Sequence, residues 1–290
     1  MPTPPSPYRT TMYALPKAPL SYAQQIETPD EAKLATFVYG TLAAQGTPVL
    51  ALHGNGGSHS TFCAVIERLV AAGLAVVAFD ARAQGQSTRG AAPLTYEQMA
   101  ADAIAVLDHL GIQRAHVVGH SDGGIEALLL ARDYPERVAS IMAGGANLTP
   151  EGVIEEPDWD IQGSISLNRA WAGYWSNPDN LRQAQSSGID ATLLFPSVED
   201  AGLSAELLQL MLDEPHIDAA SLATIACPTC VLVGEHDCIT QEETHAIANA
   251  IPGARLVVVP NVGHSLPRQA PDAVALQVLT NVLLARLMTH

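Results

Sequence analysis

The stretch Gly119-His120-Ser121-Asp122-Gly123 decides the fold, because it stands between an apolar run typical of a strand, residues 115–118, and a pattern typical of a helix, residues 123–134. It fits G-x-S-x-G, in which the serine stands at the apex of a sharp strand-to-helix turn and small neighbours make room for its strained backbone. Five residues match such a pattern by chance fairly often, but the strand–turn–helix setting strengthens the interpretation. Ser121 is therefore a candidate nucleophile, with a glycine-rich loop and a capping serine as the alternative.

On both sides of this turn, short apolar runs alternate with stretches of helical periodicity. Further strands are expected at residues 33–40, 49–52, 75–79, 138–143, 231–233 and 255–259, and further helices at residues 61–72, 95–110, 241–251 and 272–288. Continuous apolar strands that alternate with helices are typical of an α/β fold with a mostly parallel sheet covered by helices on both faces. Ligands bind such sheets at the carboxyl ends of the strands.

Residues 149–225 interrupt this alternation. They contain all three tryptophans and have the pattern of helices between polar turns. We predict that they form a helical cap inserted into the α/β core, which then consists of residues 31–148 and 226–290. The proline-rich residues 1–30 are predicted to be an extended lead-in.

A serine is a weak nucleophile near neutral pH and needs a base that a third group holds in place. His264 follows a predicted strand and lies in a loop, whereas His245 falls within a predicted helix and His290 is the last residue. Asp237 comes directly after the apolar run that begins at residue 231, and Glu235 precedes it. The order serine, acid, histidine is that of G-x-S-x-G hydrolases. We therefore predict that Ser121, Asp237 and His264 form a catalytic triad.

The glycine-rich loop at residues 53–57, HGNGG, follows the first strong strand. Acyl transfer develops an oxyanion that needs about two preorganised donors. We assign these donors to the backbone N–H groups of Asn55 and Asp122. A phosphate-binding loop is not favoured, because the Gly-Lys-Ser/Thr ending is missing. The residues expected to bind substrate are Gly56, His120, Trp159, Trp171 and Trp175.

From about residue 48 to its end, the chain resembles the α/β-hydrolase superfamily. The resemblance rests on HGNGG, DARAQGQS (Asp80–Ser87), GHSDGG, YPERV (Tyr134–Val138), VLVGEHDCI and NVGHS. The sequence departs from the usual pattern at Ala83, where relatives often carry glycine, and at Cys238, where proline commonly follows the acid. Related dehalogenases and epoxide hydrolases place aspartate where this chain has Ser121, so the resemblance implies acyl-enzyme chemistry.

The resemblance implies a serine hydrolase of small carboxylic esters that needs no cofactor. A lactone hydrolase or a carbon–carbon bond hydrolase with the same triad is an alternative, and Arg169 and Arg182 in the cap are the candidate anchors for an acidic substrate. A third possibility is a ligand-binding receptor or scaffold that retains the fold.

The composition limits the other partners. The 290 residues include 48% hydrophobic and 15% charged residues, and the formal net charge is −16. A protein of this charge is repelled by nucleic acid and by anionic membrane surfaces. The chain has no run of about 18 apolar residues, and its N-terminus lacks the apolar segment of a secretory signal. We expect a cytoplasmic protein with no membrane span and no nucleic-acid partner, and a homodimer is compatible with the sequence.

The cysteines do not indicate a metal site. Cys227 and Cys230 have redox-motif spacing but run straight into an apolar stretch, so we interpret them as structural thiols, with a functional pair as the alternative. Cys63 and Cys238 lie apart from them, and ligands at zinc-site spacing are not evident.

Asp122 is an unusual residue to follow the nucleophile. A fixed negative charge beside a developing oxyanion must be neutralised. The sequence leaves two neutralisers open: a protein donor, such as backbone N–H groups at the start of the following helix, or a cation on the substrate such as the ammonium group of an amino-acid ester.

Overall fold

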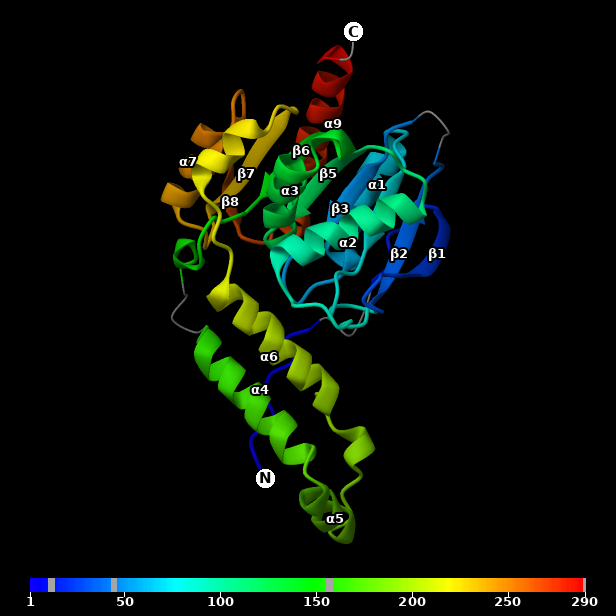
Figure 1. The fold of residues 1–290 in the computed structure, drawn as a ribbon, viewed down its shortest axis with the longest axis vertical. Coiled ribbons are helices and arrows are strands. Elements are labelled where there is room, and N and C mark those ends of the chain that lie inside the picture. Colours follow the sequence, from blue (N-terminus) through cyan, green and yellow to red (C-terminus); the bar gives the residue numbers. More distant parts are fainter. Residues whose placement is uncertain (10–13, 43–45, 155–158, 289–290) are drawn as a thin grey trace.

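The computed structural model describes residues 1–9, 14–42, 46–154 and 159–288 and contains one sheet of eight strands (Figure 1). The strands lie in the order β1-β2-β4-β3-β5-β6-β7-β8. The two pairs that involve β2 are antiparallel and all other neighbours are parallel. The strands are β1 (Leu20–Glu27), β2 (Lys33–Tyr39), β3 (Val49–Leu52), β4 (Val76–Phe79), β5 (Ala115–His120), β6 (Val138–Gly144), β7 (Thr229–His236) and β8 (Arg255–Gly263).

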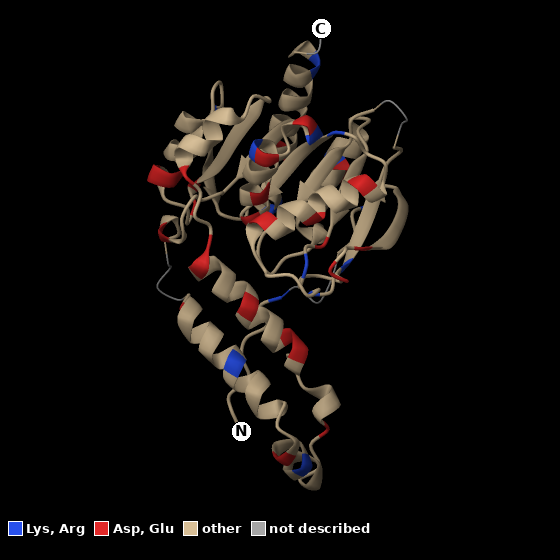
Figure 2. Ribbon diagram, viewed as in Figure 1, with Lys and Arg blue, Asp and Glu red and all other residues tan. Residues whose placement is uncertain are grey.

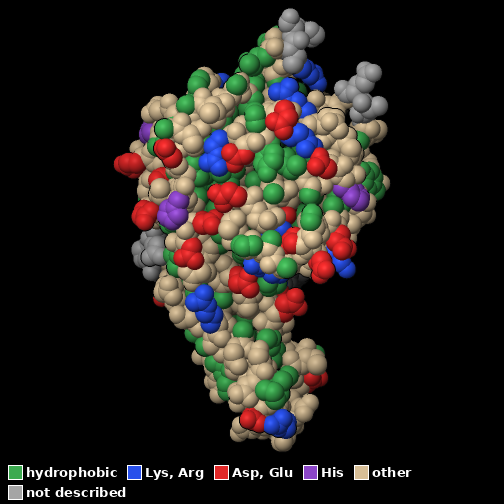
Figure 3. Space-filling model, viewed as in Figure 1, with side chains coloured by type: hydrophobic (Ala, Val, Ile, Leu, Met, Phe, Trp, Pro, Cys, Tyr) green, Lys and Arg blue, Asp and Glu red, His purple; other side chains and the backbone are tan. Residues whose placement is uncertain are grey.

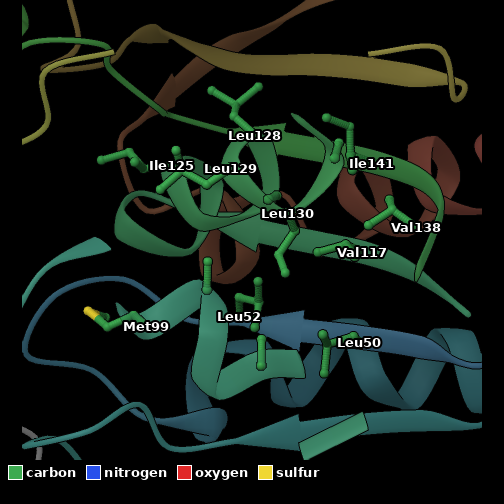
Figure 4. Packing of buried hydrophobic residues seen from close by; sticks show 14 of the residues in the cluster. Leu50, Leu52, Met99, Val117, Ile125, Leu128, Leu129, Leu130, Val138 and Ile141 are labelled. Carbon is green, nitrogen blue, oxygen red and sulfur yellow. The ribbon is translucent and has the colours of Figure 1, made fainter. Parts of the chain in front are cut away.

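Helices cover both faces of this sheet, as the sequence predicts. Strand residues alternate between two buried clusters: Leu50 and Leu52 of β3 pack toward α2, α3 and α7, whereas Val49 and Ala51 pack toward α1 and α9. Figure 4 shows the first cluster, in which leucines of α3 meet apolar side chains of β3, β5 and β6. The helices are α1 (Cys63–Ala71), α2 (Tyr96–His109), α3 (Asp122–Asp133), α4 (Ile161–Trp175), α5 (Pro178–Ser186), α6 (Val198–Asp213), α7 (Gln241–Ala250), α8 (Leu266–Gln269) and α9 (Pro271–Met288), with 3-10 turns at His59–Phe62, Pro135–Arg137, Pro150–Gly152, Ala191–Leu193 and Ala219–Thr224.

The prediction that residues 1–30 form only a lead-in was wrong in part, because Leu20–Glu27 is the edge strand β1. It pairs antiparallel with β2. The apolar signal is weak because most of its side chains are exposed, as on an edge strand with one solvated face. Ile26 is the strand's one residue in the buried apolar core.

The described part of residues 149–225 contains helices α4, α5 and α6 and three of the 3-10 turns, and residues 155–158 lie outside the described chain. Helices α4 and α6 lie side by side and project away from the sheet, with α5 at the far end (Figure 1). Trp171 and Trp175 pack against Ala184 and Ala201 within this insertion. We call residues 149–225 the helical insertion.

The loop after β4 contains a conformation that explains one departure from the hydrolase pattern. Ala83 has a φ of 63°, in the left-handed region that glycine adopts at little cost. Its N–H donates to the carbonyl of Thr88 at 3.0 Å, which holds the turn closed. A glycine at this position relieves the strain, which is a physical reason for its use in relatives.

Acidic residues are spread over the sheet region and the insertion (Figure 2). On the face in Figure 3, acidic and basic side chains are interspersed. Within the described chain, one helix, α9, is long and apolar enough to span a membrane by length and composition. One side of it, including Val274, Val278 and Val282, is buried against the sheet, and Leu276 and Leu283 are exposed.

Candidate active site

The turn after β5 places Ser121 in a strained conformation. Ser121 has φ 57° and ψ −121°, and its N–H donates to the carbonyl of Gly144 at 2.8 Å. The two glycines of the motif are required by contact. A Cβ on Gly119 would lie 1.8 Å from the carbonyl oxygen of Gly123, and a Cβ on Gly123 would lie 2.1 Å from that of Leu52. The crowding explains why the sequence needs glycine there, and the strain presents the Ser121 hydroxyl at the apex.

The three predicted triad residues meet at this apex. His264 Nε2 lies 3.0 Å from Ser121 Oγ, and His264 Nδ1 lies 2.6 Å from Asp237 Oδ1. Strands β5, β7 and β8 are parallel, so the residues that follow them lie at one edge of the sheet. Because a carboxylate only accepts, Nδ1 carries the imidazole proton and Nε2 is free to accept from the serine hydroxyl.

The charges of Asp237 and His264 support each other. Burial raises the pKa of Asp237, but its hydrogen bond to His264 and backbone N–H groups outweigh burial and hold the pKa below its usual value. One of these N–H groups is that of Ile239, at 3.1 Å from Oδ1. Burial lowers the pKa of His264, whereas Asp237 and the neighbouring Cys238 thiol raise it, and the net direction is upward. Asp237 thus stabilises an imidazolium at this position.

Several residues hold His264 in place. His120 Nε2 lies 2.6 Å from the carbonyl oxygen of His264, so this nitrogen is the protonated one and donates. Burial and the nearby His264 lower the pKa of His120 to about 3, and the ring is neutral near pH 7. Glu235, which lies two residues before Asp237, accepts the N–H of Asn261 at 2.8 Å, where the backbone turns with a φ of 57°. Glu235 therefore shapes the loop that carries His264.

The loop after β3 passes directly against Ser121. A Cβ on Gly54 would lie 2.8 Å from Ser121 Cβ, so only glycine fits there. Asn55 follows Gly54 on this loop, and Asp122 follows the serine itself and opens helix α3, in which the N–H groups of Gly124 and Ile125 donate to the Ser121 carbonyl. The two residues predicted to supply the oxyanion donors are thus chain neighbours of Gly54 and of Ser121.

The carboxylate of Asp122 is held by side chains. Tyr96 donates to Oδ1 at 3.1 Å, and the amide of Asn55 donates to Oδ2 at 2.8 Å. Asp122 is 3% exposed, and burial raises its pKa to about 6 although the hydrogen bonds from Tyr96 and Asn55 lower it. The sequence leaves a protein donor or a substrate cation open as neutralisers. The donors are the side chains of Tyr96 and Asn55, which lie far from Asp122 in the sequence.

Glu126, one helical turn after Asp122, also escaped the sequence analysis. It is 1% exposed, and neither carboxyl oxygen has a hydrogen-bond partner among the described residues. Burial raises its pKa well above the usual value, and the charges of Asp122 and Asp102 act in the same direction. Glu126 is therefore a buried carboxyl group whose surroundings favour its protonated form.

A cavity of about 330 Å³ opens above Ser121. Its lining includes the predicted residues Gly56, His120 and Trp159 beside the candidate triad histidine and serine. Trp171 and Trp175 do not line it; the prediction failed because a helical pattern does not reveal which face of α4 meets the core of the insertion. Lining residues that the sequence does not single out for substrate binding include Tyr8, Thr61, Tyr96, Asn147, Val153, Met211, Glu214, Cys238, Ile239, Ser265, Pro267 and Arg268.

Cys238 gives the site a set of metal-ligand atoms. Donor atoms of Asp237, Cys238 and His264 lie within 4.8 Å of one another. His264 Nδ1 and Asp237 Oδ1 are already joined by a hydrogen bond, so a metal would have to displace the proton between them.

Cys227 and Cys230 are both free thiols, and burial raises the pKa of each.

Residues 49–278 match a protein family described as the alpha/beta hydrolase family. The chain belongs to the alpha/beta hydrolase family. The match includes every residue of the candidate triad and the loop that carries Asn55.

Relatives within the alpha/beta hydrolase family cover most of the chain. Rhodomycin D methylesterase DnrP of Streptomyces peucetius is 30% identical over 249 residues, 72% of this chain and 82% of that protein. "Putative carbamate hydrolase RutD" of Caulobacter sp. (strain K31) is 28% identical over 257 residues, 83% of this chain and 92% of that protein. A thermophilic esterase from Thermogutta terrifontis has a similar structure, with a TM-score of 0.67 and 26% identity over 91% of this chain and 99% of that one.

Proposed function

We propose that this hydrolase cleaves small carboxylic esters through an acyl-enzyme intermediate on Ser121. The observation that carries the proposal is the hydrogen-bonded chain from Ser121 through His264 to Asp237, placed at a strained turn beneath a cavity. A nucleophile in contact with a base that a third group orients is the arrangement that acyl transfer requires.

In the acylation step, Ser121 Oγ attacks the ester carbonyl while His264 Nε2 accepts the serine proton. The carboxylate of Asp237 stabilises the imidazolium that forms, because the hydrogen bond at Nδ1 strengthens as the ring becomes charged. The backbone N–H groups of Asn55 and Asp122 hold the oxyanion. His264 then protonates the departing alkoxide, which leaves as an alcohol.

In the deacylation step, water attacks the Ser121 ester with His264 again as the base. The acid product leaves and the proton returns to Ser121. His120 keeps the His264 loop in position through both steps, because its N–H holds the His264 carbonyl and its ring stays neutral.

The relatives support ester cleavage in general terms. Among them are a methylesterase and a structurally similar esterase, and the carbamate named for another relative also has an acyl carbonyl. The two cap arginines do not support the carbon–carbon alternative, because Arg169 bonds Gln209, Arg182 bonds Asp179 and both are outside the cavity lining. Arg268 does line the cavity, so an anchor for an acidic substrate is present and the carbon–carbon alternative stays in the substrate tests.

The helical insertion is proposed to act as a cap over this cavity. Trp159 and Met211 of the insertion contribute to the cavity wall. The ion pair of Arg89 with Glu206 and the hydrogen bond from the Tyr96 N–H to Glu214 fasten α6 and the residue after it to the core. A cytoplasmic location is part of the same proposal.

The test is a substrate panel on purified protein: p-nitrophenyl esters of increasing acyl length, lactones of matched size, an aryl carbamate and an acidic substrate with a cleavable carbon–carbon bond next to a carbonyl. We expect the highest kcat/KM for a short-chain ester, because the cavity is small. A preference for lactones, carbamates or the carbon–carbon substrate over every ester would replace the ester proposal. The absence of turnover on all four would favour a non-catalytic role.

A further inference from the structure

The N-terminal segment brings Tyr8 into the candidate active site from a position more than forty residues before the loop that it contacts. The Tyr8 hydroxyl lies 2.9 Å from Asn55 Oδ1 and 3.3 Å from the sulfur of Met211 in α6. Its ring covers the next residue of the loop, since a Cβ on Gly56 would lie 3.0 Å from Tyr8 Cε1. Burial and the charge of Asp122 raise the pKa of Tyr8, so the hydroxyl keeps its proton and donates to the amide oxygen.

This hydrogen bond fixes the orientation of the Asn55 amide. The amide nitrogen donates to Asp122 Oδ2 at 2.8 Å and to the carbonyl of Leu207 at 3.1 Å. Both partners are acceptors, whereas Tyr8 supplies a donor, so only one of the two amide orientations satisfies all three contacts. The hydrogen bond from Tyr8 therefore completes the set of hydrogen bonds that joins the loop carrying Asn55 to Asp122 and to helix α6.

Further contacts anchor the segment on the insertion. Arg9 forms an ion pair with Asp200 of α6, and its side chain is 8% exposed. The Tyr8 ring packs against the buried cluster of Ile161, Ile165 and Leu208. Figure 1 shows the dark-blue N-terminal segment alongside α4 and α6. The N-terminal segment is thus held between the insertion and the loop that carries Asn55.

We propose that Tyr8 is a positioning and specificity residue: its hydroxyl holds the Asn55 loop in register with Ser121, and its ring forms the cavity wall that limits substrate size. This inference rests on the proposed ester hydrolysis. The hydroxyl affects the transition state, because the Asn55 N–H must lie where the oxyanion develops. The ring affects which substrates fit, because it fills space between Gly56 and the insertion.

The experiment compares Tyr8→Phe with Tyr8→Ala, and uses Tyr22→Phe on the exposed face of β1 as the matched control. We expect Tyr8→Phe to lower kcat about tenfold, in the range of a lost hydrogen bond, with little change in KM. We expect Tyr8→Ala to shift the acyl-length optimum to longer esters as well. Tyr22→Phe should match the unaltered protein in both respects.

A double-mutant cycle shows whether Tyr8 acts through Asn55. In an Asn55→Ala background, adding Tyr8→Phe should lower kcat less than twofold, because the partner is already missing. A full and additive tenfold loss in that background would overturn the positioning role. An unchanged acyl-length optimum in Tyr8→Ala would overturn the specificity role.

Hydrogen–deuterium exchange at the loop that carries Asn55 separates this inference from the proposed function. We expect Tyr8→Phe to speed exchange of residues 54–57 while the melting temperature falls by no more than a few degrees, as the loss of one hydrogen bond allows. If the unaltered protein cleaves no ester but Tyr8→Phe still speeds this exchange, ester hydrolysis is refuted and the positioning contact stands. Identical exchange in Tyr8→Phe and the unaltered protein would refute the contact.

Discussion

Replacing Asp122 with asparagine should remove a pH-dependent cost of folding. Asp122 has a pKa of about 6 in the folded protein against an ordinary value of 3.8. Each pKa unit corresponds to about 1.4 kcal/mol, so keeping this buried carboxylate ionised costs about 3 kcal/mol. Because the pKa of Asp122 is higher in the folded protein than in the unfolded chain, protonation of Asp122 favours the folded state. This stabilisation is full below about pH 4 and is lost as the pH rises through about 6.

Asparagine at position 122 keeps an acceptor for Tyr96 but turns a second amide toward Asn55. The variant therefore carries a constant penalty of about 1–3 kcal/mol for the disturbed hydrogen bonds. On top of this constant, the stability of the unaltered protein relative to the variant should fall by about 2 kcal/mol between about pH 4.5 and 7.5, the part of the titration in that window.

Urea unfolding of both proteins across this pH range measures the difference, with equal m-values as the check on two-state behaviour. A difference for Asp122→Asn that stays flat across this pH range would mean that the carboxylate titrates as in the unfolded chain, and the account of its burial would fail.

Three further predictions follow from the site. Asp122→Asn should change kcat/KM equally for a neutral ester and an α-amino ester of similar size, because Tyr96 and Asn55 already donate to the Asp122 carboxylate. A selective loss of more than about tenfold for the amino ester would show that the Asp122 carboxylate binds a cationic group of the substrate. Trp159→Ala should shift the acyl-length optimum, because Trp159 lines the cavity. Trp171→Ala removes a side chain from the core of the insertion, so it should lower the free energy of unfolding by about 3–5 kcal/mol in urea and leave the acyl-length optimum in place. The reverse pattern would contradict the cavity lining. Replacing both Cys227 and Cys230 with serine should leave kcat/KM within about twofold, since both cysteines lie at the entry of β7. A large loss of kcat/KM in this variant would indicate a functional pair of thiols. So would a reversible loss of activity when the unaltered protein is mildly oxidised.

The sequence predicts those parts of the site that follow directly from strand ends. Ser121, Asp237 and His264 each come just after an apolar run, and parallel strands bring their carboxyl ends to one edge. The sheet and its helices were predictable for the same reason, since continuous apolar runs mark strands buried on both faces.

Features that depend on contacts between distant segments were not predictable. Tyr8 lies among prolines without periodicity, and its role arises only where α6 and the loop after β3 enclose it. Trp171 and Trp175 were assigned to the cavity because the sequence does not show which face of a cap helix meets its neighbours. The hydrogen-bond donors to Asp122 come from two other segments of the chain, and no local sequence pattern links them to the turn that carries Ser121.

Covalent labelling of the nucleophile tests the central claim most directly. A fluorophosphonate probe reacts with a serine that a neighbouring base activates, and peptide mapping identifies the labelled residue. We expect one probe per chain, attached at Ser121, with loss of ester turnover in proportion to labelling, and we expect Ser121→Ala to fold normally, resist the probe and lose turnover by several orders of magnitude. Labelling of a different serine, or more than about a tenth of the activity in Ser121→Ala, would contradict the acyl-enzyme mechanism.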